Sequence, residues 1–337
     1  MRILFLIPDF RPGLWSKLHA TLAHRGLGRR VGTAPGLWAR QVFGGVLNIM
    51  RQCALARSLG VEAVLATESG ADTYGKLGVG GLPFVAWDER RRGDVCIIPD
   101  VYSSLADDVN GDVVIYEQGP LLVRADFDHL RANVRLWTCS PLMTERCRAV
   151  LPGKEPTYVP NIVDPASFPF VAQERRRRGC LAALPRKNGL TFISAVYDRY
   201  RQKGGRYWEL DLIDGVPFSE FAMRYRTPQA LLPASEVEGC GLPAMEAMAA
   251  GIVVAGRNGG GASFYMRDRE TALVANTVEE AAAALRDIED AGLRERLSEA
   301  AYEQIRDFFP DAAPKRFWEG FLAELESPVP PAPNSGT

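Results

Sequence analysis

The sequence predicts an α/β protein of two domains, each built around a parallel sheet. Short apolar runs typical of buried strands alternate with longer helix-like segments along the whole chain. The 337 residues exceed what one small core usually holds, which favours two domains. A stretch rich in proline and then in arginine, residues 165–179, separates the runs into two groups and is the expected linker.

The expected elements follow one another in chain order. In the first half, apolar runs predict strands at 3–7, 63–66, 95–99, 113–116, 136–139 and 157–160. In the second half, they predict strands at 180–184, 208–213, 230–233 and 252–255. A helix is expected over 46–58, and a last amphipathic helix over 311–326 has Phe317, Trp318, Phe321 and Leu325 on one face. The expected domains are 1–168 and 169–310, with the last helix packing back on the first and a disordered tail at 327–337.

Composition excludes several classes of function. The net charge of −1 gives no case for a nucleic-acid partner. The opening apolar run is too short for a membrane span and lacks a signal-peptide cleavage pattern, so a cytoplasmic protein is expected. Six cysteines without a C-x-x-C pair are expected to be reduced, buried thiols. With only three histidines, neither a zinc site nor a histidine-based triad is favoured.

The most informative segment is 229–261, which predicts a strand, a glycine-rich turn, a helix and a second strand. Pro243 suits the first turn of that helix and Gly251 its C′ position. Such a turn directs free N–H groups and the positive helix end at one point, which favours a phosphate. Glu238 and Glu246 flank the turn, and carboxylates accept hydrogen bonds from vicinal sugar hydroxyls. A nucleotide or nucleotide-sugar site is predicted; an ordinary βαβ unit with two solvated acids is the alternative.

The segment EGCGLPAMEAMAAG resembles the E-x7-E motif of glycosyltransferase family 4, whose members are retaining enzymes with the GT-B fold. The resemblance implies two facing Rossmann-like domains with parallel sheets and a cleft between them. It also implies that Glu246 holds the donor ribose and Glu238 a hydroxyl of the transferred sugar. The similarity extends to VPNIVD and FGGVLNIM but is strong only over 231–285, and Gln118 stands where the family often has a histidine.

Further site residues are expected at strand ends and glycine turns. Arg186 and Lys187 follow the first strand of the second domain, where they would stabilise charge on a departing diphosphate. No D-x-D acid cluster is apparent, so a metal-independent enzyme without a metal site is expected. Gln118 would bind a sugar hydroxyl in the cleft. The other expected donor contacts are Gly44, Gly45, Gly215, Val216, Gly239, Gly241, Leu242, Gly260 and Gly261.

The resemblance implies a retaining glycosyltransferase without a further cofactor, with a UDP-sugar as the expected donor. The acceptor is unidentified: an anionic, a lipid-linked or a natural-product acceptor would each fit. A non-catalytic nucleotide-sugar-binding protein derived from such an enzyme is the alternative. Residues 10–43 hold six basic residues and no acid, so they are expected to form a mobile loop, to bind an anionic acceptor or to contact a membrane surface.

Overall fold

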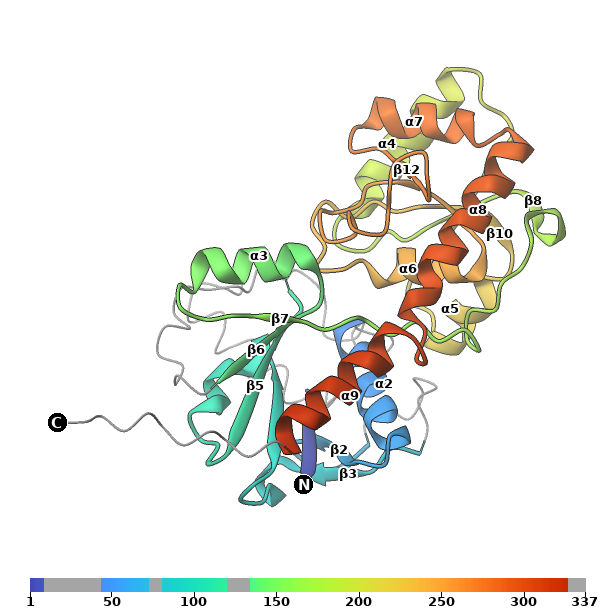
Figure 1. Ribbon diagram of the computed structural model, residues 1–337. Coiled ribbons are helices and arrows are strands. Elements are labelled where there is room, and N and C mark those ends of the chain that lie inside the picture. Colours follow the sequence, from blue (N-terminus) through green and yellow to red (C-terminus); the bar gives the residue numbers. More distant parts are fainter. Residues whose placement is uncertain (9–43, 73–80, 120–133, 327–337) are drawn as a thin grey trace.

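The computed structural model describes residues 1–8, 44–72, 81–119 and 134–326, and these ranges form two α/β domains (Figure 1). The basic segment 10–43 and the tail 327–337, for which expectations were stated above, lie outside the described residues.

The first domain contains a seven-stranded parallel sheet with the order β3-β2-β1-β4-β5-β6-β7. Its strands are β1 (Arg2–Leu6), β2 (Glu62–Thr67), β3 (Phe84–Ala86), β4 (Val95–Pro99), β5 (Asp112–Glu117), β6 (Arg135–Thr138) and β7 (Thr157–Tyr158). Its helices are α2 (Gly44–Ser58), η3 (Trp87–Glu89), η4 (Asp100–Ala106) and α3 (Pro141–Val150). Every residue of β1 and of β4 is buried, as expected for parallel strands covered on both faces.

The second domain contains a five-stranded parallel sheet with the order β12-β11-β10-β8-β9. Its strands are β8 (Arg177–Ala183), β9 (Glu209–Leu212), β10 (Pro228–Leu232), β11 (Val253–Gly256) and β12 (Leu273–Val274). Its helices are η6 (Gln173–Arg175), α4 (Gly189–Gln202), α5 (Phe218–Arg224), α6 (Leu242–Ala250), α7 (Val278–Asp287) and α8 (Ala291–Ile305). The two parallel sheets confirm the predicted α/β class.

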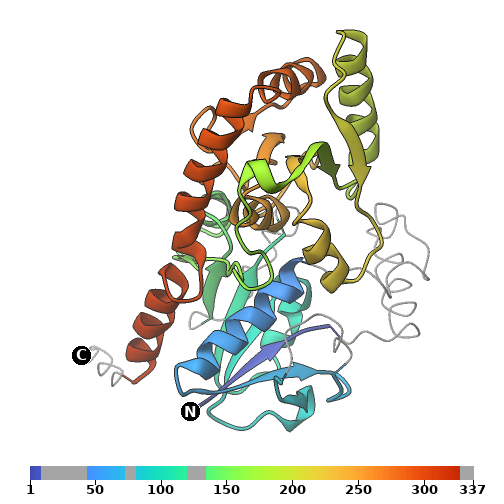
Figure 2. The ribbon, with the colours of Figure 1, turned by 90° about the vertical axis from the view of Figure 1, so that its right-hand side faces the viewer.

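Two segments cross between the domains. The first crossing segment (159–172) leads from β7 to η6, and the second crossing segment (306–312) leads through η7 (Arg306–Phe308) to the last helix, α9 (Ala313–Glu326). The N–H of Val163 donates to the carbonyl of Phe308 at 3.0 Å, so the two segments are hydrogen-bonded to each other. Figure 2 shows α8 and α9 following one another along one side of the molecule, from the second domain to the first.

The last helix packs on the first sheet. Trp318 is fully buried, with its ring centroid 5.7 Å from Phe5 of β1 and 5.6 Å from Trp137 of β6. The Trp318 Nε1–H donates to Gln52 Oε1 of α2 at 2.6 Å. The chain therefore begins and ends its described elements in the same domain.

One residue of the arginine run at 175–178 differs from the solvated linker expected for the run, whereas Arg175, Arg177 and Arg178 are exposed. Arg176 is only 5% exposed, and its guanidinium donates to the carbonyls of Val171, Tyr225 and Pro228 at 2.8–3.1 Å and to that of Ala250. Burial lowers the pKa of Arg176 to about 10. β8 starts at the next residue, so the run joins the crossing segment to the second sheet by hydrogen bonds in place of a free linker.

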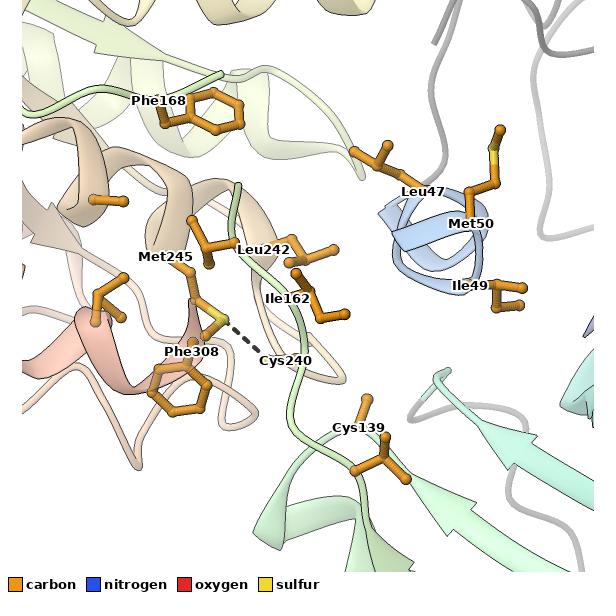
Figure 3. Close-up of a cluster of buried hydrophobic side chains, with 14 of the residues drawn as sticks. Leu47, Ile49, Met50, Cys139, Ile162, Phe168, Cys240, Leu242, Met245 and Phe308 are labelled. Carbon is orange, nitrogen blue, oxygen red and sulfur yellow. Dashed lines mark hydrogen bonds between the residues drawn. The ribbon is translucent and has the colours of Figure 1, made fainter. Parts of the chain in front are cut away.

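A continuous apolar core runs through the contact between the domains. Leu47 of α2, Ile162 of the first crossing segment and Leu242 of α6 belong to one cluster of buried side chains (Figure 3). All six cysteines are buried and free. Within the described ranges, no helix has both the length and the apolar character that crossing a membrane requires.

Candidate functional site

A cavity opens between α2 of the first domain and the carboxyl ends of β8 and β9 in the second. Its empty space is about 580 Å³, including solvent at its mouth. The lining is mostly apolar and includes three charged side chains, Arg186, Asp214 and Glu246. The remaining lining residues are Gly44, Leu47, Leu184, Ile213, Gly215, Val216, Phe218, Phe221, Leu242 and Pro243.

The turn before α6 has the local geometry that its sequence predicts. Gly241 is the N-cap in a left-handed conformation with φ +80°, and Pro243 stands in the first turn. Gly251 ends the helix with φ +84°. The hydroxyl of Tyr265 lies 2.9 and 2.7 Å from the carbonyl oxygens of Cys240 and Gly241, which fixes the turn against the loop after β11. The N-terminus of α6 is thereby held at the edge of the cavity, where Leu242 and Pro243 line it.

Glu246, on the second turn of α6, is buried at the inner end of the cavity. It is 3% exposed, and its Oε1 forms an ion pair with Arg51 Nη2 of α2 at 3.0 Å. Burial raises the pKa of Glu246, and the charge and hydrogen bond of Arg51 oppose that rise. Because Arg51 belongs to the first domain, the ion pair joins the two domains beside the cavity.

Glu238 lies in the turn next to the cavity but does not line it. Its N–H donates to the carbonyl of Gly259 at 2.8 Å, and its carboxylate lies 2.6 Å from Lys187 Nζ. Lys187 is half exposed, whereas Glu238 is largely covered. Each acid of the predicted pair therefore has a basic partner, Lys187 for Glu238 and Arg51 for Glu246.

The loop between β8 and α4 places its two basic residues in different environments. Arg186 lines the cavity, while Lys187 faces Glu238. Lys187 and Asn188 have φ of +52° and +62°, and such consecutive left-handed residues without a glycine are uncommon. Strained backbone of this kind concentrates at functional sites.

The backbones of the two domains meet at Gln118, just after β5. A Cβ built on Gly239 would lie 2.1 Å from the Gln118 carbonyl oxygen, and one on Gly45 would lie 3.0 Å from Gln118 Oε1. The N–H groups of Gln118 and Gly119 donate to Asp100 Oδ2 at 3.1 and 2.9 Å. Burial raises the pKa of Asp100, and these N–H groups oppose the rise. Glycine at position 239 thus allows close approach of the two domains, and glycine at position 45 lets the Gln118 side chain lie against α2 within the first domain.

The glycine loop after β11 packs on the turn that carries Glu238. Gly259 and Gly260 have φ of +56° and +75°, and a Cβ on Gly261 would lie 2.3 Å from the Glu238 carbonyl oxygen. The glycine loop thus packs against the backbone of Glu238.

Of the residues predicted from sequence, the cavity lining unites six: Arg186, Glu246, Gly44, Gly215, Val216 and Leu242. The others stand beside it, around the Lys187–Glu238 pair and Gln118: Glu238, Lys187, Gln118, Gly45, Gly239, Gly241, Gly260 and Gly261.

Sequence reasoning did not anticipate Arg51, Asp100, Asp214 or Phe218 as parts of the site. Asp100 could have been found, because it directly follows the buried strand β4 at the carboxyl edge of the sheet. Phe218 and Asp214 flank the predicted contacts Gly215 and Val216 and could have been included with them. Among the described residues, no group of three or more histidine, cysteine, aspartate or glutamate side chains could hold a metal ion.

Comparison with known proteins connects this geometry to a family. Residues 212–304 match the family model of the glycosyl transferases group 1. The structure is similar to sucrose-phosphate synthase from Thermosynechococcus elongatus, with a TM-score of 0.65, 13% identity, and coverage of 96% of this chain and 99% of that one. No curated protein sequence matches the chain significantly.

Two further structures are similar over nearly the whole chain. HepE from Anabaena, in complex with UDP and glucose, has a TM-score of 0.63 and 10% identity, covering 96% of this chain and 100% of that one. A glycosyltransferase from Rickettsia africae has a TM-score of 0.63 and 11% identity, covering 96% and 97%.

The molecule therefore has the GT-B fold, with two α/β domains and a cavity between them, as predicted. Within the second domain, residues 212–304 are similar to the glycosyl transferases of group 1. This match bears out the predicted resemblance to glycosyl transferases over that segment, while family 4 and retention of configuration stay predictions.

Proposed function

We propose that the protein transfers a sugar, with retention of configuration, from a nucleoside diphosphate sugar to an acceptor held by the first domain. The observation that supports this most directly is the cavity itself. It lies at the carboxyl ends of strands in a domain that matches the family model of the glycosyl transferases group 1. Its lining is mostly apolar and includes Arg186 and Glu246. UDP is the proposed nucleotide, supported by its presence in the complex of the structurally similar HepE.

The lining fits the parts of such a donor. Apolar side chains, among them Ile213, Phe218 and Phe221, would cover the nucleobase and the ribose. Glu246 would accept hydrogen bonds from the ribose hydroxyls. The N-terminus of α6 and the guanidinium of Arg186 would face the diphosphate, where both positive groups are favourable.

The Lys187–Glu238 pair would act on the transferred sugar and the leaving group. Lys187 is the more exposed partner and can turn toward a diphosphate, which frees Glu238 for a sugar hydroxyl. Arg186 and Lys187 would then neutralise charge that grows as the glycosidic bond breaks, without a metal ion. The leaving phosphate would take the acceptor's proton on the same face of the sugar, so no protein nucleophile is required. The acceptor stays open among the anionic, lipid-linked and natural-product classes.

Isosteric substitution of the two acids tests the proposal, with Glu236→Gln as the matched control. Glu236 is exposed and stands two residues before Glu238 in the same turn. Glu246→Gln is expected to weaken nucleotide binding about 10- to 100-fold, because a charged hydrogen-bond acceptor is lost. Glu238→Gln is expected to keep nucleotide binding and to lose turnover.

Calorimetric titration with UDP and donor hydrolysis over a panel of nucleotide-sugars provide the two measurements. If Glu238→Gln and Glu246→Gln both match Glu236→Gln in binding and turnover, the site assignment is wrong. If the wild type binds nucleotide but neither hydrolyses nor transfers any donor in the panel, the protein is the non-catalytic binding protein instead.

A further inference from the structure

We propose that Arg51 is a positioning residue for the donor ribose: it holds the Glu246 carboxylate ionised and oriented, so that ribose recognition by the second domain requires the first domain to be docked. The inference rests on the proposed function, because it assigns to Glu246 the ribose hydroxyls.

The contacts of Arg51 place it between both domains and the cavity. Its side chain is 6% exposed, and Nη2 lies 3.0 Å from Glu246 Oε1. Nη1 donates to the carbonyl of Ile162, in the first crossing segment, at 2.8 Å. The guanidinium carbon lies 5.7 Å from the centroid of the Phe218 ring. Two of these three partners, Glu246 and Phe218, line the cavity, so the guanidinium lies directly behind its wall.

A carboxylate as buried as Glu246 requires a compensating charge to stay ionised. The charged groups that act on it are Arg51 from α2, Arg186 from the loop after β8 and Asp164 from the first crossing segment. The hydroxyls of Tyr225 and Tyr265 also lie within its electrostatic reach.

Among these groups, Arg51 is the strongest that favours the ionised form. Burial raises the pKa of Glu246, Arg51 opposes the rise most, Arg186 opposes it less and Asp164 adds to it. Without Arg51, the pKa of Glu246 would rise further. A protonated carboxyl group is a weaker acceptor than a carboxylate, so it would hold two vicinal hydroxyls less well.

The forked guanidinium of Arg51 also fixes the orientation of the Glu246 carboxylate. One nitrogen is held by the Ile162 carbonyl and the other holds Glu246, so the carboxylate takes its position from the first crossing segment. Opening of the domains would withdraw Arg51 from Glu246. Ribose binding and domain docking would therefore favour each other, as two linked equilibria must.

The test compares Arg51→Gln with Arg57→Gln, an exposed arginine further along the same helix. The dissociation constants of UDP and of 2′,3′-dideoxy-UDP are measured by calorimetry between pH 6 and pH 9, with GDP and ADP as further probes. The wild type and Arg57→Gln are expected to have the same UDP affinity at each pH and a clear preference for the ribose form. For Arg51→Gln, we expect affinity about 10- to 100-fold weaker.

The variant should also differ in two ways that a merely structural role would not produce. Relative to the wild type, its UDP affinity should fall more steeply as the pH falls, because loss of Arg51 raises the pKa of Glu246 further and favours its protonated form. Its preference for UDP over the dideoxy analogue should approach one. When Glu246 is already replaced by glutamine, the additional change Arg51→Gln should not weaken UDP binding further, because Arg51 acts on the ribose through the Glu246 carboxylate.

A persistent effect of Arg51→Gln in the Glu246→Gln background would overturn the proposal in favour of direct ligand contact. Equal behaviour of Arg51→Gln and Arg57→Gln would overturn it as well. If Arg51→Gln does not fold, Arg51→Lys decides: an ammonium keeps the charge but lacks the fork, so the pH dependence should match that of the wild type and the ribose preference should fall. An unchanged preference in Arg51→Lys contradicts the proposal. If the wild type binds no nucleoside diphosphate at all, the proposed function fails first.

Discussion

Gly239 stands where the backbone of the second domain touches the first domain. A Cβ on this residue would lie 2.1 Å from the Gln118 carbonyl oxygen and 3.2 Å from Cys139 Sγ. Ordinary van der Waals contact begins near 3.4 Å, so Gly239→Ala demands a separation of about 1.3 Å, the difference between 3.4 and 2.1 Å. Both obstacles belong to the first domain. The substitution should therefore move the domains apart while each keeps its own fold.

The expected effect on catalysis is large for so small a change. A misplacement of about 1 Å between reacting groups can reduce the rate about 100-fold. That corresponds to about 2.7 kcal/mol in the activation free energy. Nucleotide binding should also fall, because the separation draws Arg51 away from Glu246, but it should fall less than turnover, because most of the cavity lining belongs to the second domain.

Steady-state donor hydrolysis or transfer, together with calorimetric binding of UDP, measures the two effects separately. Gly320→Ala on α9 is the control, because a Cβ there meets no atom within 4 Å. In that exposed helical position, alanine should preserve activity and add up to about 1 kcal/mol of stability. If Gly239→Ala turns over as fast as Gly320→Ala, close apposition of the domains at Gln118 is not required, and the reasoning fails.

Two further predictions concern stability. Trp318→Ala should lower the free energy of unfolding, measured in urea, by about 3–5 kcal/mol, because it removes a fully buried ring and leaves Gln52 Oε1 without its donor. Phe317→Ala, at a half-buried neighbour, should lower it clearly less. Equal losses for the two variants would contradict the packing argument. Asp94 forms a buried ion pair with Arg2 at 2.6 Å, and although burial raises its pKa, hydrogen bonds from Arg2 and a backbone N–H prevail and lower it. The contribution of Asp94 to the free energy of unfolding should be complete above its ordinary pKa of 3.8 and lost as the pH falls through the lower pKa of the folded state. The free energies of unfolding of wild type and Asp94→Asn should therefore differ by a constant amount from about pH 5 to 8 and converge in acid.

The fold class could be predicted because buried parallel strands appear in sequence as continuous apolar runs. The helix α6 was predictable at both ends from Pro243 and Gly251. Two strands were missed, β3 and β12, at one edge of each sheet. They comprise three and two residues, which is too short for a run or an alternation to stand out from loop sequence.

The ion pair between Arg51 and Glu246 could not be predicted, because its partners are 195 positions apart and meet only when the domains dock. Taken alone, Arg51 is one more basic residue in a helix. The same holds for Arg176, whose partners are four backbone carbonyls and therefore have no side-chain pattern at all. In both cases an arginine expected on a surface is buried because five N–H donors can satisfy several acceptors at once.

A stripe of buried polar residues connects α2 to the first crossing segment. Asn48, Arg51 and Gln52 stand at positions i, i+3 and i+4, which places them on one helical face, and all three are buried. Asn48 Oδ1 accepts the N–H of Ile162 at 3.1 Å, and Arg51 donates to the carbonyl of the same residue at 2.8 Å. Gln52 Nε2 donates to the carbonyl of Pro160 at 2.8 Å. Each residue of the stripe thus forms a hydrogen bond with the first crossing segment.

Helix α2 contacts the first crossing segment, α9 and the second domain, and these parts shift relative to one another if the domains rearrange. Gln52 also accepts the indole N–H of Trp318, so α9 and the first crossing segment are fixed to one face of α2. Arg51, on that face, reaches Glu246 in the second domain, and Gly44 at the start of α2 lines the cavity. Since a helix transmits displacement as a rigid element, a shift of either crossing segment reaches Glu246 and the cavity wall together. The buried polar stripe of α2 therefore ties the placement of the domains to the geometry of the cavity.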